Sequence, residues 1–352
     1  MTSLPYEETK QLDDQSGPQV SVLIAAYNRA GTLQRTLESV FAQSLAPLEV
    51  VVADDGSTDN TRTVVAAICN RYPRWRNRLH YFYQPNQGKS VALNNALKLA
   101  RGEWIAYNDS DDVWQPDKLE RQYAALTRFP ECGACVTDAV FVNSSAHLET
   151  AFTRGGFHFE DTVGRVAGAA ELMAGSFRGV YMQTLLIRRS LVDSLAGFDP
   201  QLRVSQDVDF LFRLALVADI CYVKLPLVQI ERGPAGGAER LTVRFPFESV
   251  VRLQLHQQMY TKWLSIIPCP QPKLNRLITR QFHAVCSALA NHYLLADDSR
   301  NARRALERAL RARFRAALGL KWILTFCVPA SLLSGFLSGV TRAKALRRAA
   351  SR

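Results

Sequence analysis

The stretch GEWIAYNDSDD, residues 102–112, indicates the fold class of this chain. Its apolar centre predicts a buried strand, and the strand ends in three carboxylates, Asp109, Asp111 and Asp112. In sheets of parallel strands flanked by helices, ligands bind beyond the carboxyl ends of the strands. The stretch therefore predicts an α/β fold with a polar site at one edge of its sheet.

The sequence around this stretch alternates between short apolar runs and amphipathic helical patterns. This alternation predicts a Rossmann-like, mostly parallel sheet with helices on both faces. We expect strands at 20–25, 48–53, 79–83, 103–107, 134–142 and 182–187. We expect helices at 32–43, 59–70, 90–100, 116–128 and 207–217, and no clear periodicity marks residues 143–180.

Beyond residue 232 the pattern becomes helical. The segment GPAGGAER, residues 233–240, is typical of a flexible joint, and helical patterns follow at 247–267, 273–296 and 299–318. We therefore divide the chain into a polar leader at 1–17, an α/β domain at 18–232, a helical appendage at 241–318 and a basic, apolar tail at 319–352.

The net charge of +11 on this 352-residue chain comes from its C-terminal end, where residues 300–352 hold 13 Lys and Arg and one acid, Glu307. No zinc-finger spacing or RNA-binding signature accompanies this charge, so we do not expect a nucleic-acid partner. The apolar run at 322–340 is uncharged and lies within the basic segment. We expect the tail to meet an anionic membrane, and an in-plane anchor, a single span and a soluble helical pair all remain open.

The seven cysteines and the leader indicate the cellular compartment in which we expect the protein. The cysteines are odd in number and lie in apolar contexts, which favours reduced thiols over disulfides. Cys132 and Cys135 form a C-x-x-C pair without a second pair or a suitably spaced histidine, so we expect buried packing rather than a zinc site. The leader has no apolar core typical of a signal peptide. We expect a cytoplasmic protein, peripheral at the inner face of the plasma membrane.

Three acidic clusters contain candidate binding and catalytic residues. Asp109 and Asp111, two residues apart after a strand, can hold Mn²⁺ or Mg²⁺ beside a diphosphate, although an acidic turn alone is more often a solvated turn. Asp55, which follows Asp54 at the end of another strand, can accept hydrogen bonds from a nucleoside, and the same segment can cap the next helix. Asp207 can serve as a general base, or as part of a helix N-cap.

Four motifs together resemble the large family of inverting GT-A-fold glycosyltransferases known as family two. They are PQVSVLIAAYNRAGTLQRTLESVFAQS (18–44), LEVVVADDGSTDNT (48–61), NQGKSVALNNALKLARGEWIAYNDSDDVWQPDKLE (86–120) and GFDPQLRVSQDVDFLFRLAL (197–216). They occur in the order and spacing of the family, and the resemblance covers residues 18–232. It implies an enzyme that transfers a sugar from a nucleoside diphosphate, with UDP favoured.

The resemblance also implies a role for each matching position. The nucleoside pocket would be lined by Ala25, Tyr27 and Asp55, with Asp54 beside them. Lys89 would approach the donor phosphates. Asp109 would face the ribose or the metal, and Asp111 and Asp112 would bind Mn²⁺ or Mg²⁺. Asp207 would be the general base.

The chain also departs from the family pattern at three places. Gln206 stands where many relatives have Glu before the base, and Leu93 stands where many have Arg. The sequence Glu231-Arg232-Gly233 replaces an Arg-x-His. These departures give the contacts on the phosphate side less support than the metal site.

Other classes are weaker alternatives. A sugar-nucleotide pyrophosphorylase would have a Gly-rich basic loop after the first strand, and a dinucleotide-binding dehydrogenase would have G-x-G-x-x-G. A processive polymerase would have several spans and a Gln-x-x-Arg-Trp motif. The alternative that remains is a catalytically silent, membrane-associated scaffold of the same fold. Within the enzyme interpretation we expect a single-sugar transferase acting on a glycan or polyprenyl-linked acceptor in cell-surface polysaccharide, lipopolysaccharide or glycolipid assembly.

Overall fold

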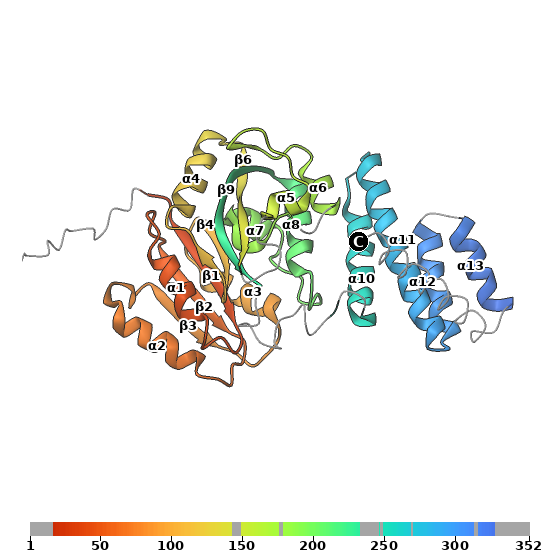
Figure 1. Ribbon diagram of the computed structural model, residues 1–352, viewed down its shortest axis with the longest axis horizontal. Helices are drawn as coiled ribbons and strands as arrows, with labels where there is room; N and C mark the ends of the chain where they lie inside the picture. The colour runs from red at the N-terminus through yellow and green to blue at the C-terminus, as the bar shows by residue number, and fades with distance from the viewer. Residues whose placement is uncertain are drawn as a thin grey trace, which may run out of the picture.

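The structure, a computed structural model, describes residues 17–142, 149–175, 179–232, 246, 249–268, 270–312 and 316–327. An α/β part with a nine-stranded sheet leads into a row of helices at the C-terminal side (Figure 1). The predicted α/β fold with a helical C-terminal region is confirmed. The expected joint at 233–240 and most of the expected leader and tail lie outside the described residues.

The first half of the sheet is parallel and has the strand order β3-β2-β1-β4. Its strands are β1 (Val20–Ala26), β2 (Glu49–Asp54), β3 (Leu79–Tyr83) and β4 (Trp104–Asp109), and helices α1 (Leu33–Phe41), α2 (Thr61–Arg71) and α3 (Lys89–Leu99) connect them. In register, Ala25 of β1 pairs with Ala53 of β2 and with Asp109 of β4. The three strands therefore end at one level, where the acidic clusters meet.

The second half of the sheet mixes strand directions. Its order continues as β8 (Leu185–Arg188), β6 (Cys132–Val142), β9 (Asp219–Glu231) and β5 (Val113–Trp114), and β7 (Val163–Arg165) pairs with β9. Only β6 and β9 run parallel, while β8 is antiparallel to both β4 and β6. Antiparallel neighbours need no helical crossover, which is why this half departs from the alternation of the first.

Several elements differ from the sequence prediction. The expected strand at 182–187 opens with a 3₁₀ turn, Met182–Thr184, before β8. Residues 143–180 contain the short elements α5 (Ala151–Gly155), β7 and α6 (Ala169–Gly175). β9, at 13 residues, was not predicted at all, because Lys224 and Pro226 interrupt its apolar run. The register shift of β6 against β9 falls there, where a proline is tolerated.

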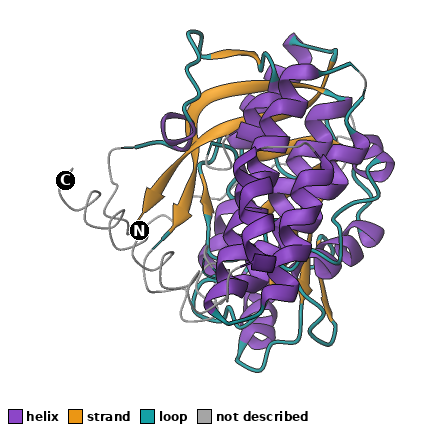
Figure 2. Cartoon of the chain, turned by 90° about the vertical axis from the view of Figure 1, so that its right-hand side faces the viewer, coloured by secondary structure: helices purple, strands orange, loops and turns teal. Residues whose placement is uncertain are grey.

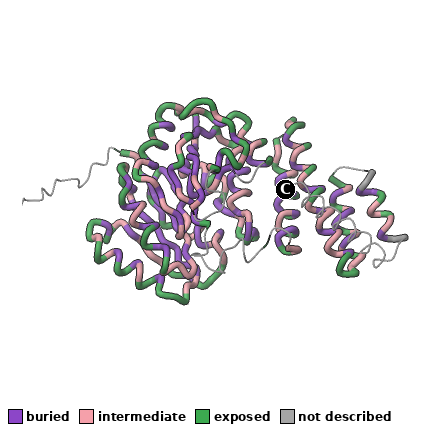
Figure 3. The backbone as a smooth tube through the Cα atoms, viewed as in Figure 1, coloured by how far each residue is buried: buried purple, intermediate pink, exposed green. Residues whose placement is uncertain are grey.

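Helices cover both faces of the sheet. Side chains alternate along β1, so that Val22 and Ile24 join the core beneath α1, α2 and α4 (Lys118–Arg128), whereas Leu23 joins the core beneath α3 and α8 (Gln206–Val217). The short helix α7 (Arg189–Ser194) follows β8. Buried residues are concentrated along the strands (Figure 3).

The C-terminal helices are α10 (Val250–Ile266), α11 (Pro272–Leu295), α12 (Ser299–Ala312) and α13 (Ala316–Cys327). They form a row (Figure 1), and a view from the side of these helices shows helices in front of the sheet (Figure 2). The buried residues of α10 to α12 are continuous with the core on the α8 face of the sheet. The single helix expected at 299–318 is two helices. Within the described residues, the helices are too short or too polar to cross a bilayer.

Candidate active site

The acidic turn after β4 brings three carboxylates together. Oxygen atoms of Asp109, Asp111 and Asp112 lie within 4.8 Å of one another, an arrangement that fits a divalent cation with oxygen ligands. Helix α1 fixes the backbone of this turn, because Thr32 Oγ1 donates to the carbonyl of Ser110 (2.9 Å) and Arg35 donates to the carbonyl of Asp111 (2.9 Å). The backbone of the turn is therefore fixed without use of the carboxylates of Asp109 and Asp111.

Asp112 connects the turn to the second half of the sheet. Its buried carboxylate accepts hydrogen bonds from Gln183 Nε2 (2.6 Å) and from the backbone N–H of Glu231 (2.8 Å). Burial, and then the charges of Asp109 and Asp111, raise the pKa of Asp112 well above its usual range. Both of its oxygens thus have protein partners, which leaves Asp109 and Asp111 as the more accessible carboxylates.

Lys89, the first residue of α3, interacts with carboxylates from two different segments, Asp109 and Asp207. Its Nζ lies 2.5 Å from Asp109 Oδ1. Burial alone would lower the pKa of Lys89, but the negative charges of Asp109, Asp207 and Asp111 outweigh it and raise the pKa. The ammonium group therefore sits among carboxylates from β4 and α8, two segments about a hundred residues apart in sequence.

Asp55 fixes the loop at residues 84–88, which directly precedes Lys89. Its carboxylate is buried and accepts hydrogen bonds from Gln84 Nε2 (2.8 Å) and from the backbone N–H groups of Gln87 (2.9 Å) and Gly88 (2.8 Å). A carboxylate offers about four lone-pair positions. Donors from the described part of the chain occupy three of these positions, which leaves one for a further donor.

Asp54 stabilises its own turn. It accepts from the backbone N–H of Ser57 (2.8 Å) and from the hydroxyl of Tyr81 (2.6 Å). Next to it, Asn28 adopts a left-handed backbone (φ 52°) and its side chain accepts from the N–H of Thr58 (2.8 Å), which joins the loops after β1 and β2. Ala25 and Tyr27, at the end of β1, are half-buried beside this junction.

Asp207 lies in the first turn of α8, after Ser205, whose backbone is left-handed (φ 59°). Asp207 is partly buried, and its carboxylate accepts only a local hydrogen bond from the N–H of Val208 (2.9 Å) among those described. Electrostatic interactions link it to Lys89 and, from α10, to Arg252. Sequence reasoning missed Arg252, because only the fold brings α10 to this place.

The three departures from the family pattern have structural explanations. Leu93 belongs to the buried core under α3, and Gln206 is buried at the start of α8. Glu231 is buried and forms an ion pair with Arg35 (3.0 Å). Glu231 therefore supports the acidic turn from behind, through the same arginine that binds the carbonyl of Asp111.

The arrangement can bind a cation, a diphosphate and an acceptor hydroxyl. Carboxylates at the end of β4 suit a hard cation, Lys89 suits a phosphate, and Asp207 is a carboxylate open to a proton donor. These groups come from separate segments, and electrostatic interactions couple Lys89 to Asp109, Asp111 and Asp207.

Comparisons with known proteins indicate the family of the chain. The model for glycosyl transferase family 2 matches residues 21–164. An uncharacterized glycosyltransferase of Nostoc sp. is 42% identical over 102 residues, which is 29% of this chain and 31% of the relative. The putative teichuronic acid biosynthesis glycosyltransferase TuaG of Bacillus subtilis is 41% identical over 106 residues, 30% of this chain and 40% of TuaG.

A longer match is the succinoglycan biosynthesis protein ExoO of Rhizobium meliloti, 34% identical over 194 residues, 54% of this chain and 53% of ExoO. The matched region thus spans about a third to a half of the length of these three relatives.

Two solved structures share the fold. The crystal structure of S. aureus TarS 1–349 in complex with UDP has a TM-score of 0.61 at 20% identity, over 84% of this chain and 81% of that one. The mannosyltransferase PcManGT from Pyrobaculum calidifontis, in complex with GDP-Man and Mn²⁺, has a TM-score of 0.52 at 20% identity, over 93% and 86%. At this identity the likeness concerns the fold, and it agrees with the predicted GT-A type.

Proposed function

This chain is a family 2 glycosyltransferase, and from that premise we propose that it transfers a sugar, with inversion, from a nucleoside diphosphate to a glycan or polyprenyl-linked acceptor. The observation that carries the proposal is the position of Lys89. Its ammonium is paired with Asp109 and is influenced by Asp111 and Asp207. A donor phosphate, a metal and an acceptor hydroxyl thus have partners around one point.

Asp207 is the proposed base. The acceptor hydroxyl attacks the anomeric carbon, its proton passes to a carboxylate oxygen of Asp207, and the bond between that carbon and the diphosphate oxygen breaks. Lys89 stabilises the negative charge that develops on the leaving diphosphate. Asp207 is partly accessible to solvent and its carboxylate accepts a single local hydrogen bond among those described, which supports this role.

Asp109 and Asp111 are the proposed ligands of Mn²⁺ or Mg²⁺, with Asp112 behind them. When bound, the cation would neutralise charge on the diphosphate. The oxygen ligands suit either ion, and the Mn²⁺ in the complex of the mannosyltransferase PcManGT supports manganese.

A UDP-sugar is the proposed donor. The complexes of TarS contain UDP and UDP-GlcNAc, and that of PcManGT contains GDP-Man. We propose that Asp55, Asp54, Tyr27 and Ala25 line the nucleoside pocket. The remaining acceptor position of Asp55 supports recognition of a base N–H or a ribose hydroxyl.

Cell-surface polysaccharide assembly is the proposed pathway class, with the chain peripheral at the cytoplasmic face of the membrane. The names of TuaG and ExoO support the first part. The basic residues of the C-terminal end, together with exposed Leu320 and Ile323 on α13, support the second.

The test is calorimetric titration of UDP, GDP, CDP and dTDP with Mn²⁺ and with EDTA. We expect one nucleotide to bind in a metal-dependent way, and Asp111→Asn to abolish that binding while the protein stays folded. Turnover of the matching nucleotide sugar should be lost in Asp207→Asn, whose nucleotide affinity should stay unchanged. Folded protein that binds no nucleotide would instead favour the silent scaffold, and full turnover by Asp207→Asn would refute the base assignment.

A further inference from the structure

Helix α10 contacts the base segment on both sides of Asp207. The side chain of Ser205, two residues before Asp207, forms a hydrogen bond with His256 Nε2 (2.9 Å). The side chain of Asp209, two residues after it, accepts from Trp263 Nε1 (2.9 Å). His256 and Trp263 are seven residues apart on α10, two helical turns along one face.

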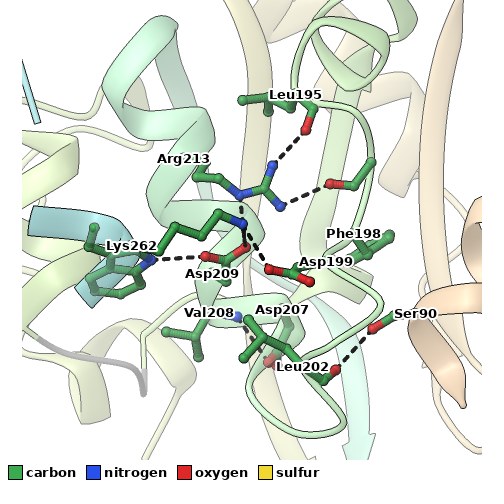
Figure 4. A network of polar contacts seen from close by, with 12 residues as sticks. Ser90, Leu195, Phe198, Asp199, Leu202, Asp207, Val208, Asp209, Arg213 and Lys262 are labelled. Atoms are coloured by element: carbon green, nitrogen blue, oxygen red, sulfur yellow. Dashed lines mark hydrogen bonds and ion pairs between the residues drawn. The ribbon is translucent and has the colours of Figure 1, made fainter. Parts of the chain in front are cut away.

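The contact at Asp209 is a buried polar network (Figure 4). Asp209 is fully buried and also accepts from Arg213 Nε (2.7 Å), one turn further along α8. Lys262 Nζ lies 3.6 Å from Asp209 Oδ2 and 3.0 Å from Asp199 Oδ2. Because a buried carboxylate that loses a donor is costly, this network fixes the distance between α8 and α10.

The loop before α8 is tied to the same network. Arg213 donates to the carbonyls of Leu195 (2.7 Å) and Gly197 (2.9 Å). Ser90, the residue after Lys89, donates to the carbonyl of Leu202 (3.1 Å). The loop that leads to the base in α8 is thus held between α3, which supplies Lys89, and α10.

The contact at Ser205 acts on a strained position. A non-glycine residue with a left-handed backbone needs support from its surroundings, and Ser205 has φ 59° directly before α8. Burial, and then the nearby Arg252, lower the pKa of His256 to about 4, so its imidazole is neutral at pH 7. The hydrogen bond between Ser205 and His256 therefore joins two uncharged side chains at pH 7.

From these contacts we infer that α10 is part of the catalytic site: His256 and Trp263 are positioning residues that hold the segment 205–209, and with it the carboxylate of Asp207, in the geometry needed for attack. The inference rests on the proposed function of Asp207. On this inference the helical appendage has a role in the catalytic site in addition to its proposed role at the membrane.

The test uses the full chain with three variants. Trp263→Phe keeps an aromatic ring against Phe212 (centroids 3.9 Å apart in the wild type) and removes the N–H donor together with part of the buried indole. His256→Leu removes the bond to Ser205, whereas His256→Gln retains a polar atom near the position of Nε2. The matched control is Ile278→Val, which weakens the buried core of α11 at a residue that is not bonded to α8 in the described structure.

Two readouts are compared at a temperature where all variants are folded. The first is amide hydrogen exchange of residues 203–211. The second is turnover of whichever nucleotide sugar binds, measured as release of the nucleoside diphosphate with water as acceptor. We expect Trp263→Phe and His256→Leu to speed exchange in this segment and to lower kcat roughly tenfold or more, because small displacements of a reacting group are costly.

Nucleotide affinity should remain unchanged in these variants, because the hydrogen bonds that they remove go to Ser205 and Asp209 of the base segment and not to the acidic turn after β4. His256→Gln should recover most of the turnover, and Ile278→Val should change neither readout. Unchanged exchange and turnover in Trp263→Phe and His256→Leu would overturn the inference. If the wild type binds no nucleotide, or Asp207→Asn is fully active, the proposed function fails, and the exchange measurement still decides whether α10 holds this segment.

Discussion

Nζ of Lys89 lies 2.5 Å from Oδ1 of Asp109, so the first residue of α3 occupies one side of the acidic turn that ends β4. The ion pair is partly buried, with about a quarter of the lysine side chain exposed (26%). On the proposed function, a metal ion bound at this turn would compete with the ammonium group for the charge of the same carboxylates, and a bound diphosphate would relieve that competition by attracting both cations.

Replacing Lys89 with Gln should thus have two opposite effects. Mn²⁺ should bind more tightly without nucleotide, since a competing cation is gone. At saturating Mn²⁺, UDP or the matching nucleotide should bind about tenfold more weakly, or about 1.4 kcal/mol, because a charge-assisted contact is lost. Calorimetry measures both, and Lys98→Gln on the same helix is the control. Equal affinities in wild type and Lys89→Gln would contradict the assignment.

The bond between Asp112 and Gln183 predicts a coupling that can be measured. Asp112→Asn can keep its acceptor toward the N–H of Glu231, but its new amide then faces the amide of Gln183. This conflict should lower the free energy of unfolding by about 1–3 kcal/mol. Adding Gln183→Glu restores a donor and an acceptor with the same net charge, so the double variant should regain part of the loss. Urea unfolding of the four proteins gives the coupling energy, and purely additive losses would argue against the bond.

Glu49 should make stability depend on pH. It is fully buried, and burial alone would raise its pKa, but hydrogen bonds from Ser21 Oγ (2.7 Å) and from Arg101 N (2.6 Å) and Nε (2.9 Å) hold the pKa below its ordinary 4.5. A lowered folded-state pKa gives stability that is present above the unfolded-state value and lost as pH falls through the folded-state value.

Glu49→Gln should therefore destabilise the protein by about 1–3 kcal/mol at pH 7, and the difference from wild type should narrow below pH 4.5. Chemical unfolding between pH 3 and pH 7 tests this expectation. A difference that stays constant over the whole range would mean that the Glu49 pKa is the same in the folded and unfolded protein.

Exposed apolar residues on α13 should contribute to membrane binding. Leu320 and Ile323 are 60% and 51% exposed, and Val217 and Leu99, on other helices, are 59% and 50% exposed. We expect the double variant Leu320→Ser, Ile323→Ser to lose roughly tenfold in affinity for phosphatidylglycerol vesicles, because burial of apolar surface adds to charge attraction. The matched double variant Val217→Ser, Leu99→Ser should bind as wild type in a sedimentation assay, and an equal loss there would count against a role for α13.

The parallel half of the fold was predictable because its signals are local. Each of β1, β2 and β4 is a short apolar run that ends in polar or acidic residues, and the helices between them have a clear amphipathic pattern. The same local pattern placed the acidic turn at the end of β4 and put Asp207 in the first turn of α8. The roles of these residues in binding and catalysis remain predictions.

What could not be predicted depends on contacts between distant parts of the chain. Asp112 was expected only as a metal ligand, yet its partners Gln183 and Glu231 lie 71 and 119 residues away. The sequence around Asp55 suggested a nucleoside contact and did not indicate its three bonds to the loop at 84–88. The link from α8 to Trp263 likewise spans 54 residues. The periodic patterns of helices and strands extend over a few neighbouring residues and do not indicate contacts at such separations.

The continuous apolar core on the α8 face has a consequence for how the chain can be recombined. Leu23 of the sheet, Phe212 of α8 and Trp263 of α10 belong to one buried cluster that reaches Leu306 of α12. A hybrid that joins the sheet of this protein to the C-terminal helices of a relative would place mismatched surfaces across that cluster. We therefore expect such a hybrid to be less stable than either parent, and the sheet and the C-terminal helices to be inherited together.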